Sequence, residues 1–206
     1  MFNSFSQGGR GHYNPNEPRD ERGRWTSDGS GAHDTDGGPI LVADRNDETY
    51  LRKERFVAAH LGEAAFWAKQ IEVPVENFLG LSALESGWGE KPIATDDKNF
   101  FGIHAPAVFS IGARQAKDNP NVWIAQFPSY GASAGSFIQR AGNLIRKISD
   151  PTEFARRLQD SGKFGVDKHG HKVPDYVEDV ASTIVKLRPF IKSECLRRGY
   201  KSCSGN

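Results

Sequence analysis

Apolar side chains recur at three- and four-residue intervals in the segment that begins at Glu48, "ETYLRKERFVAAHLGEAAFWAKQI". Residues at this spacing share one face of an α-helix, and here they are Val57, Leu61, Ala64, Ala65, Ala68 and Ile71. Similar stripes occur within residues 137–148, 154–158 and 176–187. Because helices with one apolar face must bury it, the spacing predicts a mainly α-helical domain.

Turn and cap residues separate these stripes. Asp150, Pro151 and Glu153 have the spacing of a capping box at the start of a helix. Pro74 suits the first turn of another helix. We expect Pro189 to interrupt the last helix and Gly199 to stop it.

A different pattern fills the middle of the chain. The segment "VFSIGARQAKDNPNVWIAQF" has β-branched and aromatic residues on both sides of a polar turn at residues 118–121. This pattern is typical of a β-hairpin. The sequence therefore predicts a mainly α fold with a small β-hairpin lobe, and short helices around a hairpin can leave a cleft for an extended polymer.

The chain divides by composition into three parts. Residues 1–46 are rich in Gly, Pro, Asp and Arg and have no apolar period apart from "PILVA", so we expect a disordered or extended N-terminal arm. Residues 47–190 form the predicted domain, and residues 191–206 a C-terminal tail. The tail holds both cysteines, Cys195 and Cys203. They either close a small disulfide loop or remain reduced, because only their separation in space decides.

Charge and hydropathy exclude several classes of protein. The 206 residues include 27 basic and 26 acidic side chains, a net charge of +1, whereas a nucleic-acid binder carries a basic excess. No apolar run approaches the roughly 20 residues of a membrane span. The N-terminal stretch "MFNSFSQGGRGHYNP" lacks the pattern of a secretory signal. We expect a protein made in the cytoplasm that does not bind nucleic acid.

One carboxylate, Glu85, interrupts an apolar helical stretch, "LSALESGWG". Glu85 follows Phe78 and Leu81 at helical spacing and shares their face or its edge. Burial raises the pKa of a carboxyl group, and a protonated Glu can act as a general acid. Trp88 would cover this group, and Gly87 would allow a sharp turn. The alternative is a Glu at a helix end that faces water.

The longer segment "ALESGWGEKPIATDDKNFFGI" resembles the signature of bacterial N-acetylglucosaminidases of glycoside hydrolase family 73. The family pattern has Leu where this chain has Phe100. The resemblance extends over about residues 52–187 and includes "FPSYGASAGSF" and "SGKFGVDKHGHKVPDYVEDVASTIV". It implies a lysozyme-like α+β fold with a substrate cleft, and an enzyme that degrades the glycan strands of peptidoglycan without a cofactor.

The resemblance also implies roles for individual residues. Glu85 matches the general acid that protonates the leaving glycosidic oxygen. The substrate-binding candidates are Trp88, the cleft-floor residues Asn99, Phe101 and Gly102, and the tyrosine Tyr130. Tyr176 matches a family tyrosine that lines or orders the cleft and is a catalytic candidate, although its place on an apolar stripe also suits the core.

The second catalytic group is less clear from the sequence. Glycosidases usually need a second carboxylate, and the nearest acid in the hairpin is Asp118, which also suits an ordinary turn. Asp96 and Asp97 are rivals, and the 2-acetamido group of the substrate is a third route. His169 and His171 in an inserted "KHGHK" stretch are expected to lie on an exposed loop rather than bind a metal.

Two other functions compete with this hypothesis. A lytic transglycosylase of similar fold would usually follow its Glu-Ser with a segment unlike "NFFGI". The second alternative is a non-catalytic cell-wall-binding or virion component in which Glu85 no longer acts as a general acid. The stretch "NPNEPRDERGRWT" resembles a segment of tailed-phage head and morphogenesis proteins. We therefore expect a phage or prophage enzyme that reaches the cell wall through a holin, a virion or a secretion machine, with residues 1–46 as a docking handle for the carrier.

Overall fold

The structure, a computed structural model, describes residues 47–117, 119–167 and 169–199. The chain separates into a unit Met1–Val42 and a unit Ala43–Asn206. The predicted arm of residues 1–46 lies outside the described residues, as do Asp118 and Cys203. All elements described below belong to the second unit.

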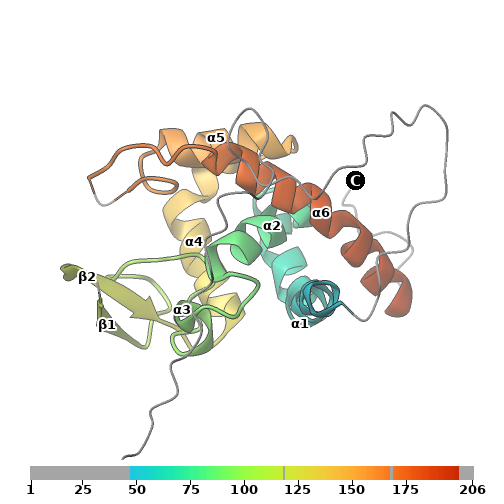
Figure 1. Cartoon of the computed structure of the whole chain (residues 1–206), viewed down its shortest axis with the longest axis horizontal. Coiled ribbons are helices and arrows are strands. Elements are labelled where there is room, and N and C mark those ends of the chain that lie inside the picture. Colours follow the sequence, from blue (N-terminus) through green and yellow to red (C-terminus); the bar gives the residue numbers. More distant parts are fainter. Residues whose placement is uncertain (1–46, 118, 168, 200–206) are drawn as a thin grey trace, which may run out of the picture. The chain divides into compact units, whose positions relative to one another are not determined.

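Helices dominate this unit, and one antiparallel hairpin accompanies them (Figure 1). The elements in chain order are α1 (Glu48–Gln70), α2 (Val75–Ser86), α3 (Pro92–Thr95), β1 (Gly112–Ala116), β2 (Asn119–Gln126), α4 (Tyr130–Ile145), α5 (Pro151–Asp160) and α6 (Tyr176–Arg197). The predicted mainly α fold with a small β-hairpin is confirmed. Among the described helices, none is long and apolar enough to cross a lipid bilayer.

The central helix is α2, which packs against both α1 and α6. Phe78, Leu79 and Leu81 are fully buried on different sides of it. Gly80 allows α6 to approach closely, because a Cβ atom there would stand 2.4 Å from Cγ1 of Ile184. A helix that is apolar all round lies in the interior. A carboxylate on α2 is therefore unusual, because burial disfavours its charged form.

The helix cap predicted at Asp150 is confirmed, and the structure adds another cap at Ser129. The Asp150 carboxylate accepts a hydrogen bond of 2.8 Å from the backbone N–H of Glu153 at the start of α5. Ser129 caps α4 through the N–H of Ala132 at 3.2 Å. These side chains satisfy backbone donors that have no partner within the helix.

The predicted interruption at Pro189 is wrong, because α6 continues through it to Arg197. A proline inside a helix frees the carbonyl four residues earlier, here that of Val185, which lies on an exposed side of α6 where water can bind it. The predicted boundary at residue 190 therefore falls inside α6, and Ile191 and Cys195 are buried. Gly199 ends the helix with φ +75°, as predicted.

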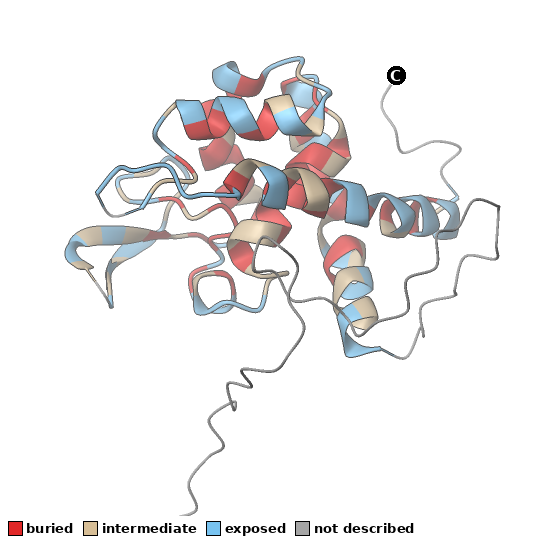
Figure 2. Cartoon of the chain, turned by 45° about the horizontal axis from the view of Figure 1, so that its top comes forward, coloured by how far each residue is buried: buried red, intermediate tan, exposed pale blue. Residues whose placement is uncertain are grey.

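The hairpin pairs Ala113 with Ala125 and Arg114 with Ile124. Its inner side chain, Ala125, is buried, whereas Trp123 is largely exposed. The loop before β1 adds a bridge between His104 and Ile124. In both Figure 1 and Figure 2 the hairpin projects on the same side as the loop between α5 and α6.

Candidate active site

Glu85 lies in the last turn of α2, where the chain leaves the core. Gly87, Trp88 and Gly89 all have positive φ angles, 57°, 62° and 79°, which turn the chain sharply. The Ser86 hydroxyl fixes this turn by accepting a 2.9 Å hydrogen bond from the N–H of Gly89. Glu85 is partly buried, so it occupies the edge of the apolar face, as predicted.

Two distant segments meet the Glu85 carboxyl group. The Tyr176 hydroxyl, at the start of α6, donates a 3.2 Å hydrogen bond to Oε1. Gly102 lies on the other side, where a Cβ atom would stand 3.5 Å from Oε2. One carboxyl oxygen therefore accepts a hydrogen bond from a tyrosine, and the other faces a residue that has no side chain.

The surroundings of Glu85 favour its protonated form. Burial raises the pKa of Glu85, and the hydrogen bond from Tyr176 and the charge of Lys91 lower it less. Burial and the neighbouring Glu85 also raise the pKa of Tyr176, so that the phenol remains a neutral donor. A carboxyl group with a raised pKa keeps its proton to a higher pH and can donate it to a bound substrate.

Lys91 is a neighbour of Glu85 that the sequence did not indicate. Its Nζ donates to the backbone carbonyl of Glu85 at 3.1 Å and to that of Leu84 at 3.4 Å. These carbonyls lie at the C-terminal end of α2, where a positive charge is favourable. Lys91 therefore anchors the turn that carries the acid.

Asn99 holds the loop that carries Gly102. Its side chain is 0% exposed and donates to the carbonyls of Ile103 at 2.7 Å and Ala125 at 2.9 Å. It also accepts from the N–H of Ile103 at 2.9 Å. Asn99 therefore positions Gly102 against Glu85 and does not itself reach the surface.

Phe101 and Tyr130, also predicted to bind substrate, are buried. Phe101 packs against Phe78 and Phe137, with ring centroids 5.0 and 4.7 Å apart. The Tyr130 hydroxyl shares a 3.0 Å hydrogen bond with Ser82 on α2. Both residues thus belong to the buried core beneath the Glu85 site. The family pattern alone did not distinguish such buried residues from residues that can contact a substrate.

Trp88 does not lie where the sequence suggested. Its ring meets Phe56 edge-on, with centroids 6.0 Å apart, and lies under the Lys53 ammonium at 5.6 Å. Both partners belong to α1. The left-handed conformation at Gly87 and Trp88 turns the indole toward that helix, and Tyr176 and the loop at Gly102 flank the acid instead.

Among the other candidates for the second catalytic carboxylate, Asp97 has both of its oxygens in contact with other side chains. It is buried, and the Arg114 Nε lies 2.9 Å from each of its oxygens. Gln126 donates a further hydrogen bond of 3.1 Å. Asp97 thus ties the loop to the hairpin, whereas Asp96 is exposed and accepts from the Thr95 hydroxyl at 2.8 Å. Asp118 lies outside the described residues.

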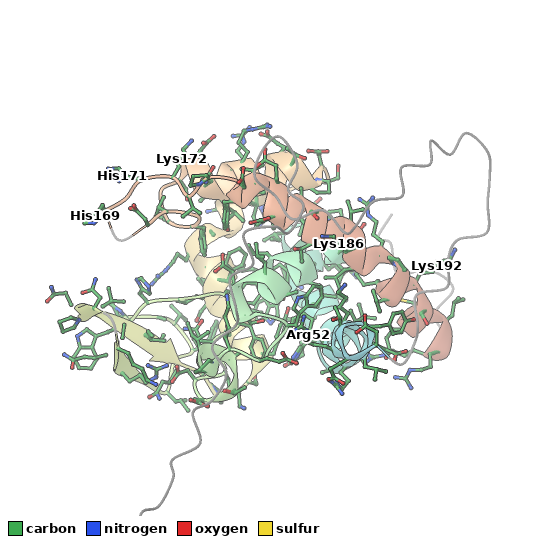
Figure 3. All side chains as sticks on the ribbon, in the orientation of Figure 1. Arg52, His169, His171, Lys172, Lys186 and Lys192 are labelled. Atoms are coloured by element: carbon green, nitrogen blue, oxygen red, sulfur yellow. The ribbon has the colours of Figure 1, made fainter. Side chains whose placement is uncertain are left out.

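His169 and His171 lie at the tip of an exposed loop, as expected (Figure 3). Asp167 accepts hydrogen bonds of 2.8 and 2.9 Å from their backbone N–H groups and so shapes the turn. Among the described residues, no three His, Cys, Asp or Glu side chains are grouped to hold a metal ion.

A carboxylic acid with a raised pKa at the end of a buried helix is typical of glycoside hydrolases such as lysozyme. The comparisons with known proteins agree with this class. Residues 63–189 match the family model of the glucosaminidases, described as mannosyl-glycoprotein endo-beta-N-acetylglucosaminidase. The chain belongs to this family, and it is a glycoside hydrolase.

Solved structures from several bacteria share the fold. A chain from a type VI secretion system effector–immunity complex of Pseudomonas protegens is 33% identical, with a TM-score of 0.62 over 70% of this chain and 96% of that one. The peptidoglycan hydrolase of Sphingomonas sp. A1 is 23% identical, with a TM-score of 0.56 and coverages of 68% and 94%. The glycoside hydrolase domain of Salmonella typhimurium FlgJ is 20% identical, with a TM-score of 0.52 and coverages of 71% and 94%. No curated protein matches this chain.

Proposed function

We propose that the protein hydrolyses the glycan strands of peptidoglycan at N-acetylglucosaminyl linkages, with Glu85 as the general acid. Family membership supports the linkage, and the shared fold of the Sphingomonas peptidoglycan hydrolase supports the polymer. The observation that carries the proposal is the Glu85 carboxyl group, held by Tyr176 on one oxygen and facing Gly102 with the other.

The geometry suggests how the proton is delivered. Tyr176 donates to Oε1 of Glu85, so the acidic proton resides on Oε2, where Gly102 has no side chain to block a sugar. Transfer of this proton to the glycosidic oxygen breaks the bond from that oxygen to C1 as positive charge develops on the sugar ring. Water then adds at C1 and gives up one proton, either to the group that assists at C1 or to the ionised Glu85, which completes the hydrolysis.

For the group that assists at C1 we retain two candidates. Asp118 in the hairpin is one, and the 2-acetamido group of the substrate is the other. Asp97 is a poor candidate because both of its oxygens are occupied by Arg114. A carboxylate that must accept a proton from water cannot also serve as a buried ion-pair partner without losing that pair.

Replacement of the acid tests the proposal. Glu85→Gln keeps the size and the acceptor for Tyr176 but removes the transferable proton, and we expect loss of about 10²–10⁴-fold in the rate of solubilisation of purified sacculi. Glu72→Gln is the matched control, because Glu72 is exposed and faces Arg146 and Lys147. Equal rates for the Glu85 variant and the wild type would remove Glu85 from the mechanism.

The route to the wall is a separate proposal. The Pseudomonas protegens relative comes from a secretion-system effector–immunity complex, which favours a secretion machine over a virion or a holin. We propose that residues 1–46 engage the carrier and that the protein acts where the wall is exposed. The catalytic residues all lie after this arm in the chain.

A further inference from the structure

A groove of about 320 Å³ lies between α1 and the loop that follows α2. Its floor is aromatic and contains Phe56, His60, Trp88 and Phe100. The volume falls at the lower end of the range of ligand sites. Nothing in the proposed acid chemistry uses this groove.

The rim of the groove is positively charged. Arg52, Arg55 and Lys98 line it, and Glu90 is the acidic residue among the lining side chains. His60 adds an aromatic surface rather than a charge near neutral pH, because burial lowers its pKa to about 4. The groove therefore suits a ligand that combines carboxylates with small apolar groups.

The cationic side chains remain available to a ligand. Arg52 contacts Glu90 at 3.1 Å and Arg55 pairs with Glu48, and these acidic partners are largely exposed. Exposed ion pairs contribute little free energy, so a ligand carboxylate can replace these partners. Lys98 donates to the Thr95 carbonyl at 2.7 Å, which leaves further N–H donors of its ammonium group for a carboxylate.

The groove lies close to the acid along the chain. Trp88 follows Glu85 by three residues, and Phe100 precedes Gly102, which faces the Glu85 carboxyl. The loop of residues 87–102 therefore borders Glu85 and the groove alike. Figure 3 shows Arg52 on the side of α1 that is turned toward this loop. An extended peptide of about five residues spans about 17 Å.

We propose that this groove binds the stem peptide attached to the glycan strand, with its carboxylates on Arg52, Arg55 and Lys98. This inference rests on the proposed function, because the stem peptide is the anionic part of peptidoglycan. Its small apolar side chains pack on the aromatic floor while the glycan lies at Glu85. The enzyme then distinguishes peptide-bearing strands from bare ones.

The test compares two substrates that differ in the peptide and in the free lactyl carboxylate that its removal leaves on muramic acid. Glycan strands are used with their stem peptides and after an amidase has removed them. For the double variant Arg55→Glu with Lys98→Glu we expect about a tenfold rise in KM on peptide-bearing strands, an unchanged kcat, and no change on stripped strands. Lys186→Glu with Lys192→Glu is the control, because it makes the same charge change on exposed positions of α6 (Figure 3).

Each outcome decides between the proposals. Equal KM changes on both strands, or no change on either, would overturn the peptide groove while leaving the hydrolase intact. If the wild type cuts neither strand, the proposed function fails. Titration with a free stem peptide then still tests the groove: the wild type should bind it at least about tenfold more tightly than the double variant, and equal affinities would overturn the inference.

Discussion

Glu85 is a residue whose ionisation links catalysis to stability. Its pKa is raised in the folded protein by burial, so the folded state binds more protons than the unfolded state above the ordinary Glu pKa of about 4.3. The stability that this provides is complete below that pH and is lost as pH rises through the raised pKa. Burial of Glu85 therefore lowers the stability of the fold at any pH where the carboxyl group ionises.

Removing this ionisation should therefore stabilise the protein in a pH-dependent way. We expect Glu85→Gln to have a higher melting temperature than the wild type above pH 5, with a difference that grows until Glu85 is fully ionised and then remains constant. Thermal unfolding from pH 4 to pH 9 measures this difference. A difference that is independent of pH would contradict the raised pKa.

Lys91 acts on the pKa of Glu85 in the opposite direction to burial. Its charge lowers the pKa of Glu85, so Lys91→Met should raise it and move the alkaline limb of the kcat profile to higher pH. Because Lys91 is exposed, we expect a shift below about one pH unit that shrinks in high salt. Lys186→Met, on the exposed side of α6, should leave the limb in place. If the alkaline limb of the kcat profile does not move in the Lys91 variant, Lys91 only caps the C-terminal end of α2.

At the scale of single residues, the sequence predicted the position of the acid Glu85 but not the arrangement of the residues around it. The helical spacing of Phe78, Leu81 and Glu85 predicts a carboxyl group at the edge of a buried face, and the structure has it there. The orientation of Trp88 depends on positive φ angles, which apolar spacing does not reveal. The supporting role of Asn99 depends on contacts with Ala125, far along the chain.

Among the elements, the contact of α2 with α6 fixes the geometry of the site, because the two helices carry Glu85 and Tyr176. Gly80 is the point of closest approach to Ile184. We expect Gly80→Ala to destabilise the fold by about 1 to 3 kcal/mol through overpacking, and to lower activity as Tyr176 moves from Glu85. Urea unfolding and sacculus assays measure the two effects.

The control for this prediction is another helical glycine. Gly62 on α1 is exposed, and a Cβ atom there meets only Arg198 Nη1 at 3.5 Å. Gly62→Ala should stabilise the helix by roughly 0.5 to 1 kcal/mol. Equal effects at the two positions would contradict the close helix contact.

The elements themselves were largely predictable, because α1, α4, α5 and α6 have regular apolar stripes and α5 begins with a recognisable capping box. The prediction at Pro189 failed because the sequence spacing did not show that Val185, whose carbonyl has no partner at Pro189, lies on an exposed side of α6. The pairing of Asp97 with Arg114 could not be predicted either, since it joins a loop to a strand.

For the whole molecule, the site residues Glu85, Gly102 and Tyr176 lie within the matched segment 63–189. We expect a chain that lacks residues 1–46 to hydrolyse sacculi at the rate of the full chain but to lose association with its carrier. Turnover assays and co-purification measure the two properties. Loss of hydrolysis in the shortened chain would instead make the arm part of the active site.

The most direct measurement of the central claim is mass spectrometry of the products released from purified sacculi. We predict that the wild type generates new reducing ends of N-acetylglucosamine and that Glu85→Gln generates none. Ends of 1,6-anhydro-muramic acid would identify a transglycosylase. Reducing N-acetylglucosamine ends formed equally by the Glu85 variant would contradict the role of Glu85 as the acid.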